Sequence, residues 1–222
     1  MKVLKSTIPS IITLANLSCG VAVLFYDIKY GVFLIMAGAF LDLWDGLAAR
    51  YLKVETDLGK QLDSLADLVT FCIAPAFLLF NTIEEPYNII AFFIPATGAL
   101  RLAKFNISDD QTYFFKGLAT PASGFLFTGI AVAYEHLFSH AIIPIILLIL
   151  FACFLNVSTL RMFSAKGFKK DPYSKYYVVI STLVFITVAI INWKFSFLAA
   201  VVFYILLSLL YHFQTRPKSS KD

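Results

Sequence analysis

Charged residues are scarce in this sequence. Lysine, arginine, aspartate and glutamate together make up 14% of its 222 residues, whereas a soluble globular domain carries about 25%. Hydrophobic residues reach 59%, and the mean hydropathy is +0.80. This composition excludes an ordinary soluble domain and predicts an all-α polytopic membrane protein.

Cysteine and histidine are also rare, with three of each. Cys19, Cys72 and Cys153 fall in separate apolar segments, so their spacing fits neither a disulfide framework nor a thiolate metal site. The histidines are scattered through the C-terminal half of the chain. A histidine-based zinc site or catalytic triad is therefore not expected.

Apolar runs take up almost the whole chain, each near the length that crosses about 30 Å of hydrocarbon as a helix. The last two runs are separated by a few residues only and should form a tight hairpin. Residues 1–213 are expected to form a single transmembrane domain, followed by a polar C-terminal tail at 214–222. We predict about eight transmembrane helices at residues 8–26, 31–51, 59–80, 87–105, 118–137, 141–160, 177–191 and 195–213.

The basic residues predict an orientation for these helices. If the N-terminus is cytoplasmic, every lysine and arginine except Lys29 and Lys194 falls on the cytoplasmic side, as the positive-inside rule requires. Both termini are then cytoplasmic. The net charge of +4 reflects this topology and contact with anionic lipid rather than nucleic-acid binding.

Four aspartates stand within or beside this apolar sequence. Asp42 and Asp45 are three residues apart, and Asp63 and Asp67 are four apart, so on helices each pair shares one face. The predicted topology puts both pairs at cytoplasmic helix ends, with Asp42 about 12 Å along its helix from Arg50. Such a site lies below the membrane surface but open to the cytoplasm, which suits a substrate with a lipid tail and a water-soluble head.

Small residues accompany these aspartates. Gly46 and Ala49 share the face of Asp42, and Gly59 precedes Asp63 by one turn. Two helices that cross at these small residues would bring the four carboxylates together. Carboxylates that close repel one another unless a cation neutralises them, and all-oxygen ligands suit Mg²⁺ or Mn²⁺. Acids at membrane depth also line ion pathways, so a cation transporter is an alternative reading.

The spacing Asp-x2-Asp-Gly-x2-Ala-Arg-x8-Gly-x3-Asp-x3-Asp resembles the signature of the CDP-alcohol phosphatidyltransferase family. Every fixed position is present: Asp42, Asp45, Gly46, Ala49, Arg50, Gly59, Asp63 and Asp67. The resemblance implies that family's transmembrane fold, a catalytic role for the 1–213 domain, and an active site that faces the cytoplasm from the inner (cytoplasmic) membrane. It also implies a homodimer, which helix faces rich in glycine and alanine would allow.

Further motifs look like the phosphatidylserine synthase branch of this family. They are Arg101-Leu-Ala-Lys-Phe-Asn106, then Phe115-x-Gly-Leu-x-x-Pro-Ala, and Ser158-Thr-Leu-Arg161, together with Asn16 in Thr-Leu-Ala-Asn-Leu-Ser-Cys-Gly. This likeness implies transfer of the phosphatidyl group of CDP-diacylglycerol to L-serine. Glycerol 3-phosphate and inositol 1-phosphate remain alternative acceptors, and the type of lipid tail stays open.

The resemblance also implies roles for individual residues. Asp42, Asp45, Asp63 and Asp67 would bind two Mg²⁺ or Mn²⁺ ions, and Asp67 would also be the general base. Nucleotide and phosphate contacts are expected from Asn16, Gly46, Ala49, Arg50, Gly59 and Lys60. An acceptor pocket is expected from Arg101, Asn106, Lys116 and Arg161.

Two of these residues have a purely structural alternative. Arg101 could anchor the end of an apolar helix by extending its side chain to the interface. Asn16 could be a helix-packing amide that hydrogen-bonds a neighbouring helix.

Overall fold

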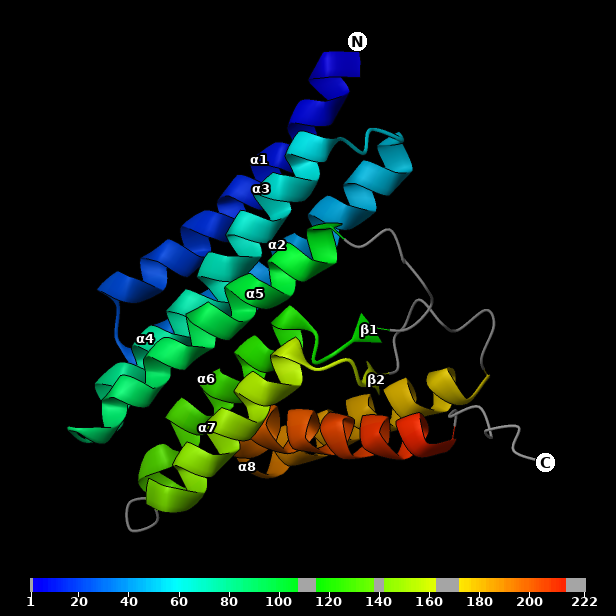
Figure 1. Cartoon of the computed structure of the whole chain (residues 1–222). Coiled ribbons are helices and arrows are strands. Elements are labelled where there is room, and N and C mark those ends of the chain that lie inside the picture. The colour runs from blue at the N-terminus through cyan, green and yellow to red at the C-terminus, as the bar shows by residue number, and fades with distance from the viewer. Residues whose placement is uncertain (1, 108–114, 138–141, 163–171, 215–222) are drawn as a thin grey trace.

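The computed structural model describes residues 2–107, 115–137, 142–162 and 172–214. Helices make up nearly all of this part of the chain (Figure 1). The elements in order are α1 (Lys2–Ala22), η1 (Val23–Phe25), α2 (Ile28–Leu52), α3 (Asp57–Leu68), η2 (Val69–Ile73), α4 (Ala74–Thr82), η3 (Tyr87–Phe92), α5 (Phe93–Ile107), β1 (Phe115–Lys116), α6 (Thr120–Leu137), α7 (Ile142–Val157), β2 (Arg161–Met162) and α8 (Pro172–Gln214). The all-helical prediction is confirmed apart from β1 and β2, which are two residues each.

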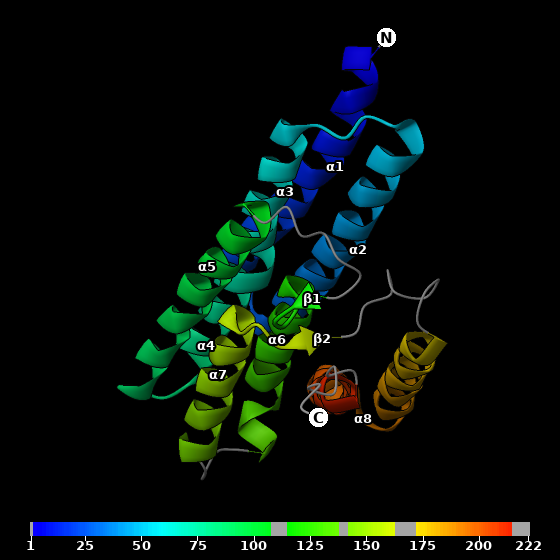
Figure 2. The ribbon, with the colours of Figure 1, turned by 45° about the vertical axis from the view of Figure 1, so that its right-hand side comes forward.

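A short turn reverses the chain between α2 and α3. Lys53, which follows the last residue of α2, takes a left-handed backbone conformation with φ 53° and ψ 47°. Thr56 caps α3, because its hydroxyl accepts a hydrogen bond of 3.0 Å from the Gly59 N–H. Such a cap typically contributes about 1 kcal/mol. The two helices therefore run back along the bundle in opposite directions, and both pack on α1 (Figures 1 and 2).

Close backbone contacts join α1 and α2 to the π-helical segment η2. An added Cβ at Gly38 would lie 2.5 Å from Thr70 Cγ2 and 2.8 Å from Asn16 Oδ1, and one at Gly20 would lie 2.6 Å from Thr70 Oγ1. The Thr70 hydroxyl in turn donates a 3.0 Å hydrogen bond to the Asn16 carbonyl oxygen. These three segments therefore form a tightly packed base beneath the aspartates.

This close packing makes Gly38 sensitive to substitution. We expect Gly38→Val to destabilise the protein by about 1–3 kcal/mol, the usual effect of overpacking a core. Thermal unfolding in detergent would measure the change. Gly46→Val is the matched control on the same helix, since the nearest atom to its added Cβ would be the end of the Arg50 side chain at 3.6 Å. A Gly38→Val protein that unfolds at the wild-type temperature would contradict the close approach of α1, α2 and η2.

The second half of the chain packs around α6. Gly117, with φ +76°, lets the segment before α6 approach the end of α7, where a Cβ would lie 2.8 Å from the Leu155 carbonyl oxygen. On the other side of α6, Gly129 lies against the backbone of Leu198 in α8. The rings of Phe125 and Phe197 stack there at 5.4 Å between centroids. The buried core is continuous from η1 to α8.

Among the described residues, four helical segments are long and apolar enough to cross a membrane: Ser6–Phe25, Ile28–Leu52, Asp57–Thr82 and Tyr87–Ile107. They match the first four predicted spans to within a few residues, and the chain is an integral membrane protein. The fifth and sixth predicted spans are α6 and α7, with 18 and 16 residues. α7 ends at Val157, a few residues before the predicted 160, because the chain there turns into β2.

The last two predicted spans are the two arms of α8. They meet at Asn192, where φ −157° and ψ 102° interrupt the helix, and the chain doubles back as the predicted hairpin (Figures 1 and 2). In Figure 1 both arms lie at an angle to α1–α5. A total of eight crossings therefore stays a prediction. The helix continues through Gln214, and the rest of the predicted tail lies outside the described residues.

Candidate active site

Three carboxylates from α2 and α3 meet in space. Asp42, Asp63 and Asp67 each present an oxygen that lies within 4.8 Å of the corresponding oxygens of the other two. The reversal of the chain between α2 and α3 explains why these carboxylates meet. Asp42 lies about as far before the turn as Asp63 and Asp67 lie after it, so all three come to the same level of the bundle. We call these three side chains the three-carboxylate cluster.

Asp67 is the member of this cluster with a buried, unpaired oxygen. Its Oδ1 has no hydrogen-bond partner among the described residues. A buried acceptor without a partner costs about 1–3 kcal/mol, and more when the group is charged. Asp67 is also followed directly by the π-helical segment η2, and such widened turns occur often at functional sites.

The cluster has the donor set of a hard divalent cation. It offers only carboxylate oxygens, which Mg²⁺ and Mn²⁺ prefer, and the unpaired Oδ1 of Asp67 leaves a position that a cation would satisfy. A bound cation would also relieve the mutual repulsion of three nearby carboxylates. The residues present therefore fit a divalent metal.

Asp45, the fourth predicted ligand, lies apart from this cluster. Its side chain is 4% exposed, and its Oδ2 accepts a hydrogen bond of 2.6 Å from the Thr13 hydroxyl on α1. Three residues along a helix also turn the side chain by about 60° from that of Asp42, which directs Asp45 toward α1. Asp42 therefore lies beside the aspartates of α3, whereas Asp45 is hydrogen-bonded to α1.

The predicted helix crossing at Gly46 and Gly59 is wrong. Among the described residues, the nearest atoms to an added Cβ at Gly46 belong to the Arg50 guanidinium, and the nearest to one at Gly59 is the Thr56 hydroxyl. The close crossings are at Gly20 and Gly38 instead, because α2 and α3 pack on α1 rather than on each other. Within the part of the chain that the structure describes, neither Gly46 nor Gly59 is covered by another helix.

Among the other predicted nucleotide and phosphate residues, Arg50 lies beside Gly46, whereas Asn16 lies deeper, against Gly38. Asn16 is fully buried, and neither of its amide atoms has a hydrogen-bond partner among the described residues. Its side-chain oxygen is the atom that approaches Gly38. Ala49 is partly buried and Arg50 is exposed near the end of α2. A helix-packing amide would be paired, so the unpaired amide of Asn16 favours a ligand contact.

Lys60 connects α3 to the end of α5. Its ammonium group donates a hydrogen bond of 3.2 Å to the Asn106 carbonyl oxygen and lies 5.8 Å from the centroid of the Phe105 ring. The Asn106 amide donates to Ser64 Oγ at 2.9 Å and to Gln61 Oε1 at 3.3 Å. These bonds hold Asn106 of α5 against α3, the helix that carries Asp63 and Asp67.

Arg101 is directed into the protein. One guanidinium nitrogen donates a hydrogen bond to the hydroxyl of Thr120, the first residue of α6, and its buried Nε has no partner among the described residues. The guanidinium is also close enough to Asp67 for their charges to interact. An arginine that served only as a topology anchor would extend to the interface instead.

Lys116 and Arg161 belong to the two short strands. β1 and β2 pair antiparallel, with Lys116 opposite Arg161 and Phe115 opposite Met162. The structure therefore brings together the two sequence motifs around residues 115–121 and 158–161. The side chains of Lys116 and Arg161 lie outside the part of the chain that the structure describes.

Sequence reasoning missed several polar residues that support these side chains. Thr13 binds Asp45, Thr120 binds Arg101, and Ser64 binds Asn106. For Thr13 a signal was available, because it precedes Asn16 by three residues on an apolar helix and so lies on nearly the same face. For Thr120 and Ser64 no local pattern pointed to a partner, since each bond joins distant segments.

Comparison with known proteins agrees with this geometry. The family model described as CDP-alcohol phosphatidyltransferase matches residues 6–151. The chain is 37% identical over 136 residues to the CDP-diacylglycerol–serine O-phosphatidyltransferase of Bacillus subtilis, an alignment that covers 58% of this chain and 77% of that protein. The protein with the same description from Methanocaldococcus jannaschii is 32% identical over 142 residues, which cover 64% of this chain and 68% of that one.

A third relative with this description, from Mycobacterium leprae, is 36% identical over 129 residues, which cover 52% of this chain and 43% of that protein. The matched family region contains all four aspartates and runs from α1 into α7. The chain therefore belongs to the CDP-alcohol phosphatidyltransferase family.

Proposed function

We propose that this chain transfers the phosphatidyl group of CDP-diacylglycerol to the hydroxyl of L-serine and releases CMP. The observation that carries the proposal is the three-carboxylate cluster, in a chain whose relatives are described as CDP-diacylglycerol–serine O-phosphatidyltransferases. Phosphoryl transfer needs charge neutralisation and alignment more than covalent help from the protein. An acidic cluster at one end of apolar helices can bind the cations that neutralise the phosphates and can align the lipid substrate with the acceptor.

In the proposed reaction a new bond forms between the serine hydroxyl oxygen and the phosphorus that bears diacylglycerol. The bond from that phosphorus to the oxygen of CMP breaks, and CMP leaves with the electron pair. Asp67 takes the proton of the serine hydroxyl, because its buried Oδ1 has no hydrogen-bond partner among the described residues and can accept one. Asp42 and Asp63 supply the other two carboxylates of the cluster beside Asp67.

The cluster would hold Mg²⁺ or Mn²⁺ through Asp42, Asp63 and Asp67, with Asp45 as a further ligand of a two-ion site. When bound, two such ions stabilise the charge that develops on the attacking and leaving oxygens. Thr13 keeps Asp45 oriented on α1 through its 2.6 Å hydrogen bond.

The nucleotide would lie in the space beside Gly46 and Gly59. Neither glycine carries a side chain that would fill that space, and Ala49 keeps the same face of α2 slim. The Asn16 amide, which has no hydrogen-bond partner among the described residues, would contact the cytidine only where the nucleotide reaches down to the level of Gly38. Arg50 and Lys60 supply positive charge for the phosphates.

The acceptor pocket would form where α5 and α6 meet α3. Arg101 offers its guanidinium to the serine carboxylate, and Thr120 fixes that guanidinium. Asn106, which is hydrogen-bonded to Ser64 of α3, would form the wall of the pocket next to α3. Lys116 and Arg161, whose backbones are paired in β1 and β2, complete it.

Replacing Arg101 should impair serine use more than lipid use. We expect Arg101→Ala to raise the KM for serine by about tenfold or more, since a charge-assisted hydrogen bond contributes about 1.5–3 kcal/mol. The KM for CDP-diacylglycerol should change much less. Steady-state CMP release at varied serine and varied lipid separates the two effects. Lys104→Ala, at an exposed position one turn further along α5, is the control, and an unchanged serine KM in Arg101→Ala would remove Arg101 from the pocket.

We also propose a membrane topology for the chain and a homodimeric assembly. About eight spans, with both termini and the site on the cytoplasmic side of the cytoplasmic membrane, follow from the distribution of lysine and arginine. A homodimer fits the exposed apolar faces of α1 and α2 and the expectation drawn from the family motif. Measurement of mass in detergent and cysteine accessibility from either side of the membrane would test these two points.

The deciding test is a head-group assay. Purified protein is incubated with CDP-diacylglycerol and Mg²⁺ or Mn²⁺, and CMP release is followed with serine, glycerol 3-phosphate or inositol 1-phosphate. We expect release with serine only. Release with another acceptor would keep the acidic mechanism and discard the serine pocket. If folded protein releases no CMP with any acceptor, the transferase proposal fails and the cation-transport alternative returns.

A further inference from the structure

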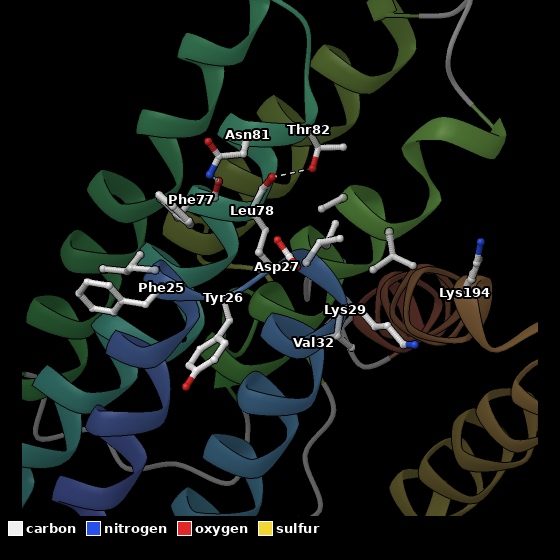
Figure 3. Close-up of a pocket in the computed structure, with 14 residues that line it drawn as sticks. Phe25, Tyr26, Asp27, Lys29, Val32, Phe77, Leu78, Asn81, Thr82 and Lys194 are labelled. Carbon is white, nitrogen blue, oxygen red and sulfur yellow. Dashed lines mark hydrogen bonds between the residues drawn. The ribbon is translucent and has the colours of Figure 1, made fainter.

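A large pocket opens at the end of the bundle away from the three-carboxylate cluster. Its volume is about 1030 Å³, near the upper end of the usual range for ligand pockets, about 300–1,000 Å³. It lies where η1 and the start of α2 meet α4, α6 and the bend of α8 (Figure 3). Asp27, which lines it, and Asp42 of the cluster are about 22 Å apart along the chain of α2 at 1.5 Å per residue. The pocket is therefore a separate site.

Part of the lining is apolar and accessible. Phe25, Val32, Phe77 and Leu78 supply aromatic and aliphatic surface, and Phe25 is 79% exposed. A largely exposed phenylalanine beside an apolar cavity favours contact with hydrocarbon rather than with water. This part of the pocket suits an acyl chain.

The charged part of the lining consists of two cations and one anion. Lys29 and Lys194 both line the pocket, together with Asp27, and they are the two basic residues that the predicted topology places on the outer side. Figure 3 shows both lysines toward one side of the pocket, with Asp27 nearer to Leu78. Asn81 and Thr82 add polar groups at the end of α4.

Tyrosines at this level indicate the depth of the pocket in a bilayer. Tyr26 and Tyr30 are 58% and 60% exposed, and their rings lie 6.2 Å apart between centroids. Exposed tyrosine is enriched at the level of lipid head groups. A head group of the leaflet on this side would therefore meet the charged part of the lining.

We propose that this pocket binds one phospholipid whose head group carries a phosphate, a carboxylate and an ammonium group. The two lysines bind the phosphate and the carboxylate, and Asp27 binds the ammonium. An acyl chain lies on Phe25, Val32 and Phe77. Phosphatidylserine has this head group, and its charges are the inverse of those in the pocket. Binding needs no transfer reaction, so the inference is independent of the function proposed above.

Photo-crosslinking tests this inference. The full-length protein is placed in nanodiscs of phosphatidylcholine with a trace of phosphatidylserine that carries a photoactivatable acyl chain, and labelled peptides are identified by mass spectrometry. We expect labels within residues 25–32 and 77–82. The double variant Lys29→Gln, Lys194→Gln should reduce this labelling by about tenfold or more, as expected for the loss of charge-assisted hydrogen bonds. Lys104→Gln, at an exposed position on α5, should leave it unchanged.

Competition distinguishes the head groups. Unlabelled phosphatidylserine should displace the probe, whereas phosphatidylglycerol, which has the phosphate alone, should displace it at least about tenfold less well. Asp27→Asn should reduce that difference. Equal competition by both lipids, labelling that ignores the double variant, or labels confined to the surroundings of the three-carboxylate cluster would each overturn the proposal.

CMP release measured on the same samples separates this inference from the proposed function. The double lysine variant should retain wild-type turnover, because both lysines lie far from the cluster. Labelling at residues 25–32 in a protein that releases no CMP would refute the transferase proposal alone, and turnover without such labelling would refute this inference alone.

Discussion

Asp67→Asn should lose transfer by about 10³-fold or more and still fold. Asparagine has nearly the size of aspartate but lacks both its negative charge and its ability to accept a proton. The loss of a general base alone reduces turnover by about 10²–10⁴-fold, and the cluster also loses one of its three charges. Removal of a charge from three carboxylates within 4.8 Å relieves repulsion, while Arg101 loses a nearby opposite charge. These effects oppose each other, so the melting temperature should change little in metal-free buffer.

Single-turnover release of CMP at saturating serine is the measurement for this variant. Asp57→Asn is its matched control, because Asp57 is an exposed aspartate in the first turn of the same helix and is not part of the cluster. That control should retain turnover within a few-fold of wild type. Normal turnover in Asp67→Asn would end its assignment as the base, whereas a lower melting temperature would point to a structural role for its buried oxygen.

Removal of divalent metal should abolish CMP release with every acceptor. The three-carboxylate cluster is itself negative, so without a divalent cation it repels the phosphates of the substrate, and Arg50 and Lys60 alone do not neutralise both. We expect activity at background level after treatment with a chelator and full recovery on addition of Mg²⁺ or Mn²⁺. Turnover that survives in chelated, metal-free protein would refute a metal-assisted mechanism.

Metal binding can also be followed without turnover. A ligand present at 100 times its Kd stabilises a folded protein by about 2.7 kcal/mol, so Mg²⁺ or Mn²⁺ should raise the melting temperature of the wild type. The double variant Asp42→Asn, Asp63→Asn should lose this increase, because only one member of the cluster remains charged. Asp57→Asn is again the control. An equal increase in all three proteins would show that the metal acts elsewhere.

Much of the helical layout could be predicted from the sequence. The first four spans follow from hydropathy and agree with the structure to within a few residues, because apolar runs of this length satisfy their backbone in a membrane only as helices. The approach of Asp42 to Asp63 and Asp67 could also be predicted, since a short polar connection between two helices puts their adjoining ends at one level. The spacing of the motif therefore predicts the meeting of these three aspartates, but not the separate position of Asp45.

The contacts between distant segments could not be predicted in this way. The faces of Gly46 and Gly59 were expected to touch, but both α2 and α3 pack on α1, and the tight contacts are at Gly20 and Gly38. A glycine at helical spacing shows that an approach is possible and not which partner uses it. The pairing of β1 with β2 likewise depends on how α6 and α7 pack.

The π-helical segment η2 sets a rotational phase between two parts of one long helix. Asp63 and Asp67 precede it, and the apolar helix α4 follows it. A π turn holds about one residue more than an α turn, and one residue corresponds to about 100° of rotation. Deletion of a single residue within 69–73 would therefore rotate the aspartates away from Asp42 while α4 kept its packing. The number of residues in this segment therefore matters to the metal site as much as their packing does.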